Sequence, residues 1–173
     1  MNNNFGFIHD KLEIKLLILF LLHRIPEGID YDTLAELTMF DDGIGYFDFS
    51  ESVSELISNG QLAYKNNRYS ITAKGKKNSD ITEMHLPFSV RQEAEKRAGK
   101  LRAKQNRNSM ISTSHSEITK DGSKVRLSLS DGACEILSLE ILASNEKQAL
   151  ALEKGFRDNA ESIYTSLIEL ILD

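Results

Sequence analysis

Five cations fall within a short stretch of the chain that contains no carboxylate. Residues 60–77 include no Asp or Glu, and their cations are Lys65, Arg68, Lys74, Lys76 and Lys77. Unopposed positive charge of this density can hold phosphate groups without reading a base sequence. The alternative is an ordinary solvated patch whose positive charge offsets part of the net negative charge of the protein itself. We favour phosphate contact, and we expect these side chains and Asn67 to contact a nucleic acid.

A segment that precedes this stretch is expected to be helical, and its outward face should carry acidic residues and no cation. The outward positions are Tyr46, Asp48, Ser50, Glu51, Ser54 and Glu55. Carboxylates would be repelled by phosphates, and no lysine or arginine lies on this helix to offset them. The neutral residues Tyr46, Ser50 and Ser54 are therefore the candidates for contact with base edges. A helix used for packing, or for meeting a basic protein, explains the acidic face equally well.

The sequence gives little support for catalysis. Its four histidines are His9, His23, His85 and His115, and none lies at metal-ligand spacing from another His, a Cys or a carboxylate pair. No phosphate-binding glycine loop or nucleophile-elbow pattern is present. We therefore expect no enzyme activity, no catalytic residue, no metal site and no cofactor. The single cysteine, Cys134, has apolar neighbours, and we expect its thiol to be buried and inert.

The elements that must position the cations lie in the first half of the chain. Apolar periodicity predicts helices from residue 9 or 10 to 23, over 31–38, and from 46 or 48 to 59. Ile29 can form a short edge strand before the second helix. Gly60 follows the third helix at the position where a helix commonly ends in a left-handed residue. The pair Asn66-Asn67 then suits a two-residue turn between strands 62–65 and 68–72.

A helix that leads directly into a small hairpin is the outline of a winged helix-turn-helix. The inward face of the third helix is expected to be Phe49, Val53, Leu56 and Ile57. The pattern Leu-x-x-x-Gly-x-Leu from Leu56, followed by Tyr-Ser-Ile-Thr-x-x-Gly from Tyr69, resembles the recognition helix and wing of bacterial winged-helix regulators. The resemblance implies that the third helix reads DNA and that the hairpin is the wing.

The second half of the chain begins with a basic helix and continues with alternating polar and apolar residues. A connector helix is expected over 88–108, which contains seven Lys or Arg against two Asp or Glu, with Ser89 and Gln92 as a capping pair. Three strands are expected over 110–119, 123–130 and 133–143. Asp121-Gly122 and Asp131-Gly132 between them are strong hairpin signals, so the strands should form an antiparallel meander.

The last helix is expected to run from a cap at Asn145, with Gln148 three residues on, to about Leu172. Its last turns are apolar over most of their circumference, which is more than one three-stranded sheet needs as a cover. An uncovered apolar patch of this kind usually marks an interface. We therefore expect a homodimer with contact residues Phe156, Ile163, Leu167, Leu170 and Ile171. Packing of this end onto the connector helix or the first domain of the same chain is the alternative.

Composition sets the class of protein. A chain of 173 residues with 40% hydrophobic residues can bury one good core or two small ones. Its net charge is −5, and its longest apolar run, residues 16–22, is too short to span a membrane. Together with the single cysteine, these features lead us to expect a cytoplasmic protein that has no membrane partner.

Taken together, these patterns predict an α+β protein in three parts. They are a winged-helix domain over 1–87, a connector helix over 88–108, and a domain over 109–173 in which one long helix covers a three-stranded antiparallel sheet. The whole chain resembles an uncharacterised bacterial family of small proteins with this organisation, presumed to be transcriptional regulators. The resemblance implies a regulator that binds double-stranded DNA. The alternatives are a winged-helix module that binds a protein partner without DNA, and a sensor whose small-molecule effector lies between the sheet and the last helix.

Overall fold

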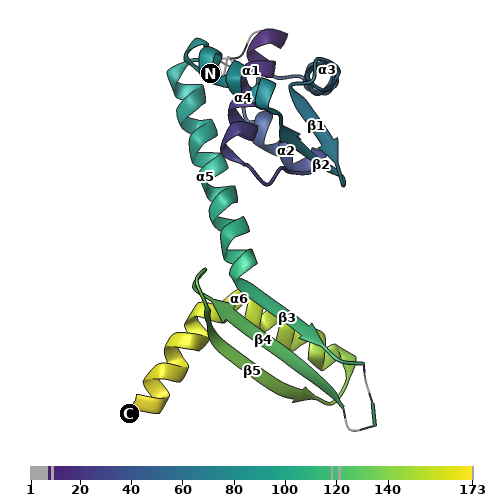
Figure 1. Cartoon of the computed structure of the whole chain (residues 1–173), viewed down its shortest axis with the longest axis vertical. Coiled ribbons are helices and arrows are strands. Elements are labelled where there is room, and N and C mark those ends of the chain that lie inside the picture. Colours follow the sequence, from purple (N-terminus) through teal and green to yellow (C-terminus); the bar gives the residue numbers. More distant parts are fainter. Residues whose placement is uncertain (1–7, 9, 118, 121, 173) are drawn as a thin grey trace, which may run out of the picture. The chain divides into compact units, whose positions relative to one another are not determined.

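The fold is taken from a computed structural model that describes residues 8, 10–117, 119, 120 and 122–172. These residues form an α+β fold with two compact units, Met1–Arg102 and Ala103–Asp173 (Figure 1). The elements are α1 (Lys11–Arg24), α2 (Tyr31–Thr38), α3 (Tyr46–Ser58), β1 (Leu62–Lys65), β2 (Arg68–Ile71), α4 (Ala73–Thr82), the 3-10 helix η1 (Glu83–His85), α5 (Phe88–Met110), β3 (Ile111–His115), β4 (Ser123–Ser130), β5 (Glu135–Ala143) and α6 (Glu146–Leu172).

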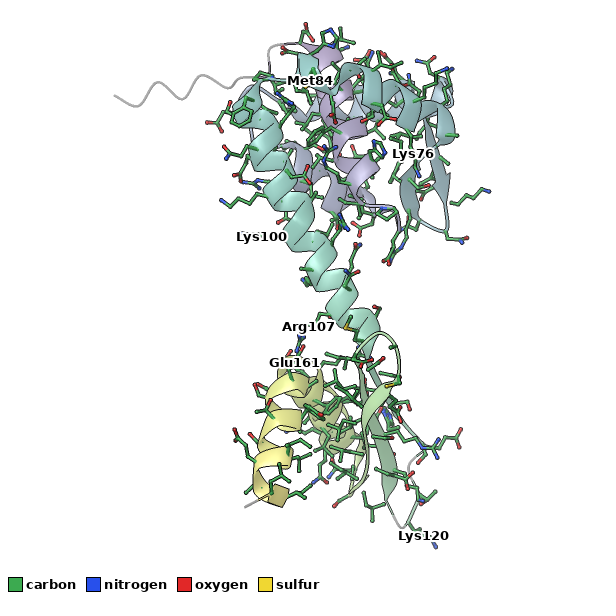
Figure 2. The ribbon with its side chains drawn as sticks, turned by 60° about the vertical axis from the view of Figure 1, so that its left-hand side comes forward. Lys76, Met84, Lys100, Arg107, Lys120 and Glu161 are labelled. Carbon is green, nitrogen blue, oxygen red and sulfur yellow. The ribbon has the colours of Figure 1, made fainter. Side chains whose placement is uncertain are left out.

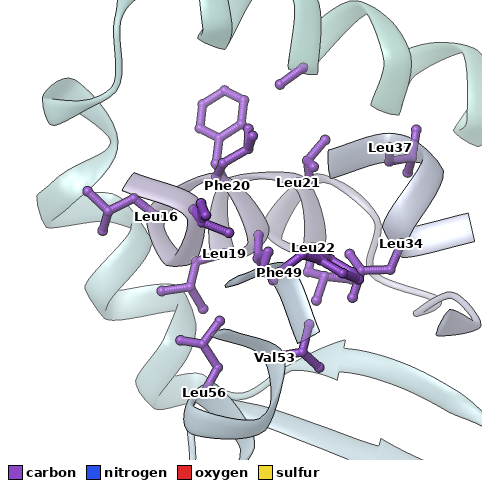
Figure 3. Packing of buried hydrophobic residues seen from close by; sticks show 14 of the residues in the cluster. Leu16, Leu19, Phe20, Leu21, Leu22, Leu34, Leu37, Phe49, Val53 and Leu56 are labelled. Carbon is purple, nitrogen blue, oxygen red and sulfur yellow. The ribbon is translucent and has the colours of Figure 1, made fainter. Parts of the chain in front are cut away.

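Helix α1 is the centre of the first hydrophobic core. It starts after Asp10, whose carboxylate accepts a 2.8 Å hydrogen bond from the Glu13 amide. His9, the other predicted start, lies outside the described residues. Leucines on most sides of α1 are buried, which confirms that α1 is not a surface helix. Figure 3 shows these side chains packed against α2 and α3. The face that α3 contributes is Phe49, Val53 and Leu56. Ile57, also expected to face inward, is 36% exposed because it lies beyond the edge of that face.

The hairpin that follows α3 forms as its sequence predicts. Gly60 adopts φ +68°, and the Gln61 amide reaches back to the Leu56 carbonyl to close the helix. Asn66 and Asn67 adopt φ +50° and +60°, the conformation that a two-residue turn of the primed type requires. The antiparallel pair β1–β2 follows from that turn.

A short extended segment before α2 pairs with the hairpin. Ile29 and Tyr69 exchange two backbone hydrogen bonds, at 3.0 and 2.7 Å. The preceding Gly28 has φ +68°, and a Cβ there would meet the Tyr69 carbonyl oxygen at 2.8 Å, so only glycine lets the two backbones come this close. The expected edge strand at Ile29 is therefore present as a single bridge beside β2.

Helix α4 is not predicted by the sequence pattern. Thr72 caps it by accepting a 3.2 Å hydrogen bond from the Gly75 amide. Only Gly75 and Ser79 of α4 are buried, so the helix lacks the apolar stripe that would reveal it in a sequence. The Thr72 hydroxyl also donates toward the Gly60 and Gln61 carbonyls, which fixes the start of α4 against the end of α3.

Helix α5 contributes to the first core through its N-terminal half. Val90, Ala94 and Ala98 are buried in that core, as their spacing predicts. The expected cap at Ser89 is wrong, because α5 begins at Phe88 and the Pro87 carbonyl already accepts from the Arg91 amide.

The second unit contains the three-stranded antiparallel sheet β3–β4–β5, which confirms the predicted meander. Val125, Leu127 and Leu129 of β4 form the buried centre of its core with Phe156 of α6. The turn between β4 and β5 is longer than expected, since Asp131 accepts hydrogen bonds from the Ala133 and Cys134 amides at 2.8 and 2.9 Å. Strand β5 therefore starts at Glu135.

Both turns of this sheet differ in detail from what the sequence predicts. Cys134 lies in the β4–β5 turn and is exposed, so the expectation of a buried thiol is wrong. The turn between β3 and β4 includes Gly122 with φ +99°, while Asp121 lies outside the described residues. Strand β3 ends at His115, earlier than predicted, and Thr119 forms an isolated bridge with Gly122.

Helix α6 has the predicted capping pair and an unpredicted kink. Asn145 accepts from the Gln148 amide at 2.9 Å, and the Gln148 side chain accepts from the Ser144 amide at 2.7 Å. Asn159 has the non-helical angles φ −130° and ψ 16°, so α6 consists of two legs. Just beyond the kink, the Glu161 carboxylate accepts two 2.7 Å hydrogen bonds from Arg107 of α5 (Figure 2).

Candidate nucleic-acid interface

The tip of the β1–β2 hairpin carries two of the five predicted cations. Lys65 and Arg68 are cross-strand partners next to the turn. The Arg68 guanidinium donates at 3.3 Å to the Gly28 carbonyl, so it also helps to hold the loop between α1 and α2. Tyr64 donates at 2.7 Å to the side-chain oxygen of Asn67 and restrains that predicted contact residue. Lys65 is exposed, and its ammonium group has no hydrogen-bond partner among the described residues.

The other three cations lie on α4, not on the hairpin. Lys74 donates at 2.7 Å to the Asn59 carbonyl at the C-terminal end of α3, where a cation complements the helix dipole. Lys76 and Lys77 are exposed, and the described part of the chain offers them no ion pair (Figure 2). The five cations are therefore unequal, because Arg68 and Lys74 already bind carbonyl groups of the chain itself.

Two of the three carboxylates of α3 form ion pairs with lysines of α1. Lys11 forms an ion pair with Glu51, and Lys15 forms one with Glu55. Hydrogen bonding from Lys15 lowers the pKa of Glu55, and the hydrogen bond to Glu51 raises the pKa of Lys11. The sequence does not predict these ion pairs, because α3 itself carries no cation and the lysines that pair with its glutamates lie 40 residues earlier in the chain. The acidic character expected for the outward face of α3 is thus reduced at both glutamates.

The three neutral base-contact candidates on α3 differ in accessibility. Tyr46 is exposed at the first residue of the helix, and Ser50 is half-buried. Ser54 is exposed, but its hydroxyl donates to the Ser50 carbonyl at 3.1 Å, which leaves its lone pairs as acceptors. Tyr46 and Ser54 are therefore better placed for an external contact than Ser50.

A cluster of aromatic rings connects these elements and is missed by sequence reasoning. The Tyr31 ring lies 6.5 Å from Tyr46 and 5.9 Å from Tyr69, and Tyr69 lies 4.8 Å from Tyr64. Phe47 adjoins Tyr46 and is 85% exposed. The cluster thus joins the starts of α2 and α3 to the hairpin. No local pattern reveals it, because its members come from segments that are far apart in the chain.

Neighbouring groups at the start of α2 disfavour ionisation of the Tyr46 phenol in this cluster. The hydroxyl of Tyr31 and, more weakly, the carboxylate of Asp32 raise the pKa of the Tyr46 phenol. Burial raises the pKa of Tyr69. Both phenols therefore remain neutral hydrogen-bond donors at neutral pH.

The predicted dimer residues are distributed along both legs of α6. Phe156 is 2% exposed and packs against the sheet of its own chain. Ile163 and Leu167 are half-buried, whereas Leu170 and Ile171 are each 76% exposed. A cavity of about 450 Å³ with an almost wholly apolar lining lies between α6 and the sheet. This is the position that the sequence predicts for the alternative small-molecule site.

Two further properties concern metal binding and membrane insertion. Within the described ranges, no three His, Cys, Asp or Glu side chains come together as a metal-binding group. None of the helices in that part of the chain is both long and apolar enough to cross a membrane.

The arrangement defines an α+β protein of two units, one with a cation-bearing hairpin and one with a helix-covered meander. The chain belongs to the family described as "Domain of unknown function (DUF4364)", which matches residues 14–171. The predicted membership of an uncharacterised family that covers nearly the whole chain is thereby confirmed. No curated protein and no solved structure matches the chain.

Proposed function

We propose that this protein is a DNA-binding transcriptional regulator with a winged helix-turn-helix in its first unit, and that it acts as a cytoplasmic homodimer. The observation that carries the proposal is the order and pairing of elements. Helix α1, the bridge at Ile29, helices α2 and α3 and the hairpin β1–β2 follow the succession of a winged helix-turn-helix. In that succession α3 is the recognition helix and the hairpin is the wing.

The charge distribution supports contact with phosphate at the hairpin and α4. Lys65, Lys76 and Lys77 are exposed, and none of their ammonium groups has a hydrogen-bond partner among the described residues, so all three can bind an external partner. The ion pairs of α1 with Glu51 and Glu55 reduce the repulsion that these two glutamates would otherwise exert on DNA. The aromatic cluster adds phenol hydroxyls and ring faces beside α3.

Dimerisation fits a weakly basic binding surface. A two-fold operator binds two copies of the same interface, which doubles the number of phosphate contacts. The exposed apolar end of α6 is the surface that we assign to this contact.

The first prediction tests the phosphate anchor. Replacement of Lys65, Lys76 and Lys77 with Ala should weaken binding to genomic DNA fragments of any sequence. It should reduce the slope of log K against log salt by about 0.9 for each phosphate group that the variant no longer neutralises. Fluorescence anisotropy at several salt concentrations measures both effects. Lys120→Ala is the matched control, because this exposed lysine lies in the second unit.

An unchanged slope in the triple variant would refute the anchor and favour the second candidate function, a winged-helix module that binds a protein partner. The specific observation in its favour is that Phe47 and Tyr46, 85% and 52% exposed, place two aromatic rings side by side, and a contiguous exposed patch of this kind is typical of protein interfaces. In that case Phe47→Ala should weaken the capture of the partner and leave any residual DNA binding unaltered.

A further inference from the structure

The cavity of the second unit is an open groove with an apolar lining. Leu139 and Ile141 of the edge strand β5 form one side, and Ala151 and Gly155 of the first leg of α6 form the other. Helix α6 packs mainly over β3 and β4, which leaves the β5 side of the groove open. The polar member of the lining is Gln148, and its side-chain oxygen already accepts the Ser144 amide. An occupant of this groove therefore finds almost no hydrogen-bonding group and has to be apolar.

The same unit presents an apolar helix end that the other described residues of this unit leave exposed. After the kink at Asn159, the side chains of Ile168, Leu170, Ile171 and Leu172 are 42–81% exposed. Four large apolar residues in five consecutive positions form a contiguous patch, whereas a monomeric protein usually exposes such residues singly. Groove and helix end are thus two uncovered surfaces of the same chemical character within one unit.

Charges beside the two surfaces have opposite signs. Lys147 and Lys154 lie four residues before and three residues after Ala151, so they border the outer side of the groove. Glu169 lies within the apolar helix end. All three side chains are exposed, and none of them forms an ion pair with another described residue. A helix end seated in the groove would bring Glu169 toward these lysines.

We propose that the groove of one copy receives the last turns of α6 from a second copy, and that the exchange is reciprocal. A two-fold interface needs a surface that contains both the protruding and the receiving part, and the two legs of α6 supply both. The inference rests on the homodimer of the proposed function and assigns its interface. It does not depend on DNA binding.

Gly155 provides the direct test. Gly155 lines the groove and a Cβ at this position meets no atom within 4 Å, so a larger side chain there has open space to occupy. Sedimentation equilibrium at micromolar concentration should show a dimer for the wild type and for Gly155→Ala. It should show a monomer for Gly155→Trp and for the Leu170→Asp, Ile171→Asp double variant. Circular dichroism should show unchanged helix content in all of them.

A charge exchange tests whether the contact is between copies. Glu169→Lys should weaken the dimer at least several-fold, because it places a cation against Lys147 and Lys154. Lys154→Glu in the same chain should restore much of the affinity. This pair of variants touches no buried residue, so it remains informative if the groove variants fold poorly.

Three results would overturn the proposal. They are a wild-type monomer at micromolar concentration, a dimer that withstands both Gly155→Trp and Glu169→Lys, and native mass spectrometry that finds an apolar small molecule bound to the wild type and absent from Gly155→Trp. A normal dimer with no salt-dependent DNA affinity would instead refute the proposed function and leave this interface intact.

Discussion

Asp30 fixes the start of α2 through two contacts with Thr33. Its carboxylate accepts the Thr33 amide at 2.8 Å and the Thr33 hydroxyl at 3.0 Å. The hydrogen bond from the amide is the main reason that the pKa of Asp30 lies below its ordinary value of 3.8. A carboxylate with a lowered pKa stabilises the folded state above that ordinary value, and the contribution is lost as the pH falls through the folded value.

Asp30→Ala should therefore lower the free energy of unfolding by about 1 kcal/mol at pH 7, the usual contribution of a helix N-cap. The deficit should shrink as the pH falls below the ordinary value of 3.8, because the unfolded chain then takes up a proton at Asp30 before the folded carboxylate does. Asp30→Asn keeps the acceptor oxygen and should lie close to the wild type at low pH. Urea denaturation at pH 7, 5 and 3.5 measures this. A deficit that stays constant over this range would contradict a role for the charge.

The cations of the candidate interface can be recognised from the sequence, but the sequence does not show which of their side chains are free. The five residues share a charge and a short stretch of chain, and both properties are visible in a sequence. The carbonyl partners of Arg68 and Lys74 are not, because Gly28 and Asn59 come next to them only through the fold. Lys11 and Lys15 were missed as partners of the α3 glutamates for the same reason.

The helices contain three glycines whose surroundings differ. Gly75 of α4 lies against the first core, and a Cβ there would meet the Gln61 carbonyl oxygen at 2.2 Å. Around Gly99 of α5 and Gly155 of α6, a Cβ would meet no atom within 4 Å. The first glycine is needed for a close approach between backbones, and the other two are not.

Alanine at each of these positions should separate the two cases. Gly99→Ala and Gly155→Ala should raise the free energy of unfolding by up to about 1 kcal/mol, the difference in helix propensity between the two residues. Gly75→Ala should lower it, because the contact with Gln61 forces α4 away from the hairpin. Thermal melts of the three variants, which differ from the wild type by one methyl group each, test this. Stabilisation by Gly75→Ala would contradict the close approach.

Elements with a strong local signal were predicted, and those shaped by tertiary contacts were not. Turn residues with positive φ, such as Asn66 and Asn67, can be recognised from residue type, because Asn tolerates the left-handed conformation better than most residues. Helix α4 has no apolar stripe and depends on Thr72, whose cap and carbonyl contacts require the hairpin to be in place. The kink at Asn159 likewise leaves no mark in the periodicity of α6.

Each of the two units has a hydrophobic core of its own. The first core is built around α1, and the second lies between the sheet and α6, with no residue in common. The composition predicted either one good core or two small ones, and it could not decide between them. The division depends on which apolar residues meet in space.

Truncation of one buried side chain in each core should affect different unfolding transitions. Leu17→Ala should destabilise the unit that contains α1 by about 2–5 kcal/mol, and Phe156→Ala should have a similar effect on the second unit. Differential scanning calorimetry should show two transitions, each variant lowering the midpoint of one. A single transition that both variants shift equally would show that the two units unfold together.

Cys134 is the only cysteine of the chain, and its exposed position in the β4–β5 turn gives it a practical consequence. A maleimide dye will label the native protein at one site without mutagenesis. Mixed donor- and acceptor-labelled molecules would then report self-association by resonance energy transfer. The same thiol can oxidise into a covalent pair that imitates a dimer, so such measurements require a reducing agent or the Cys134→Ser variant.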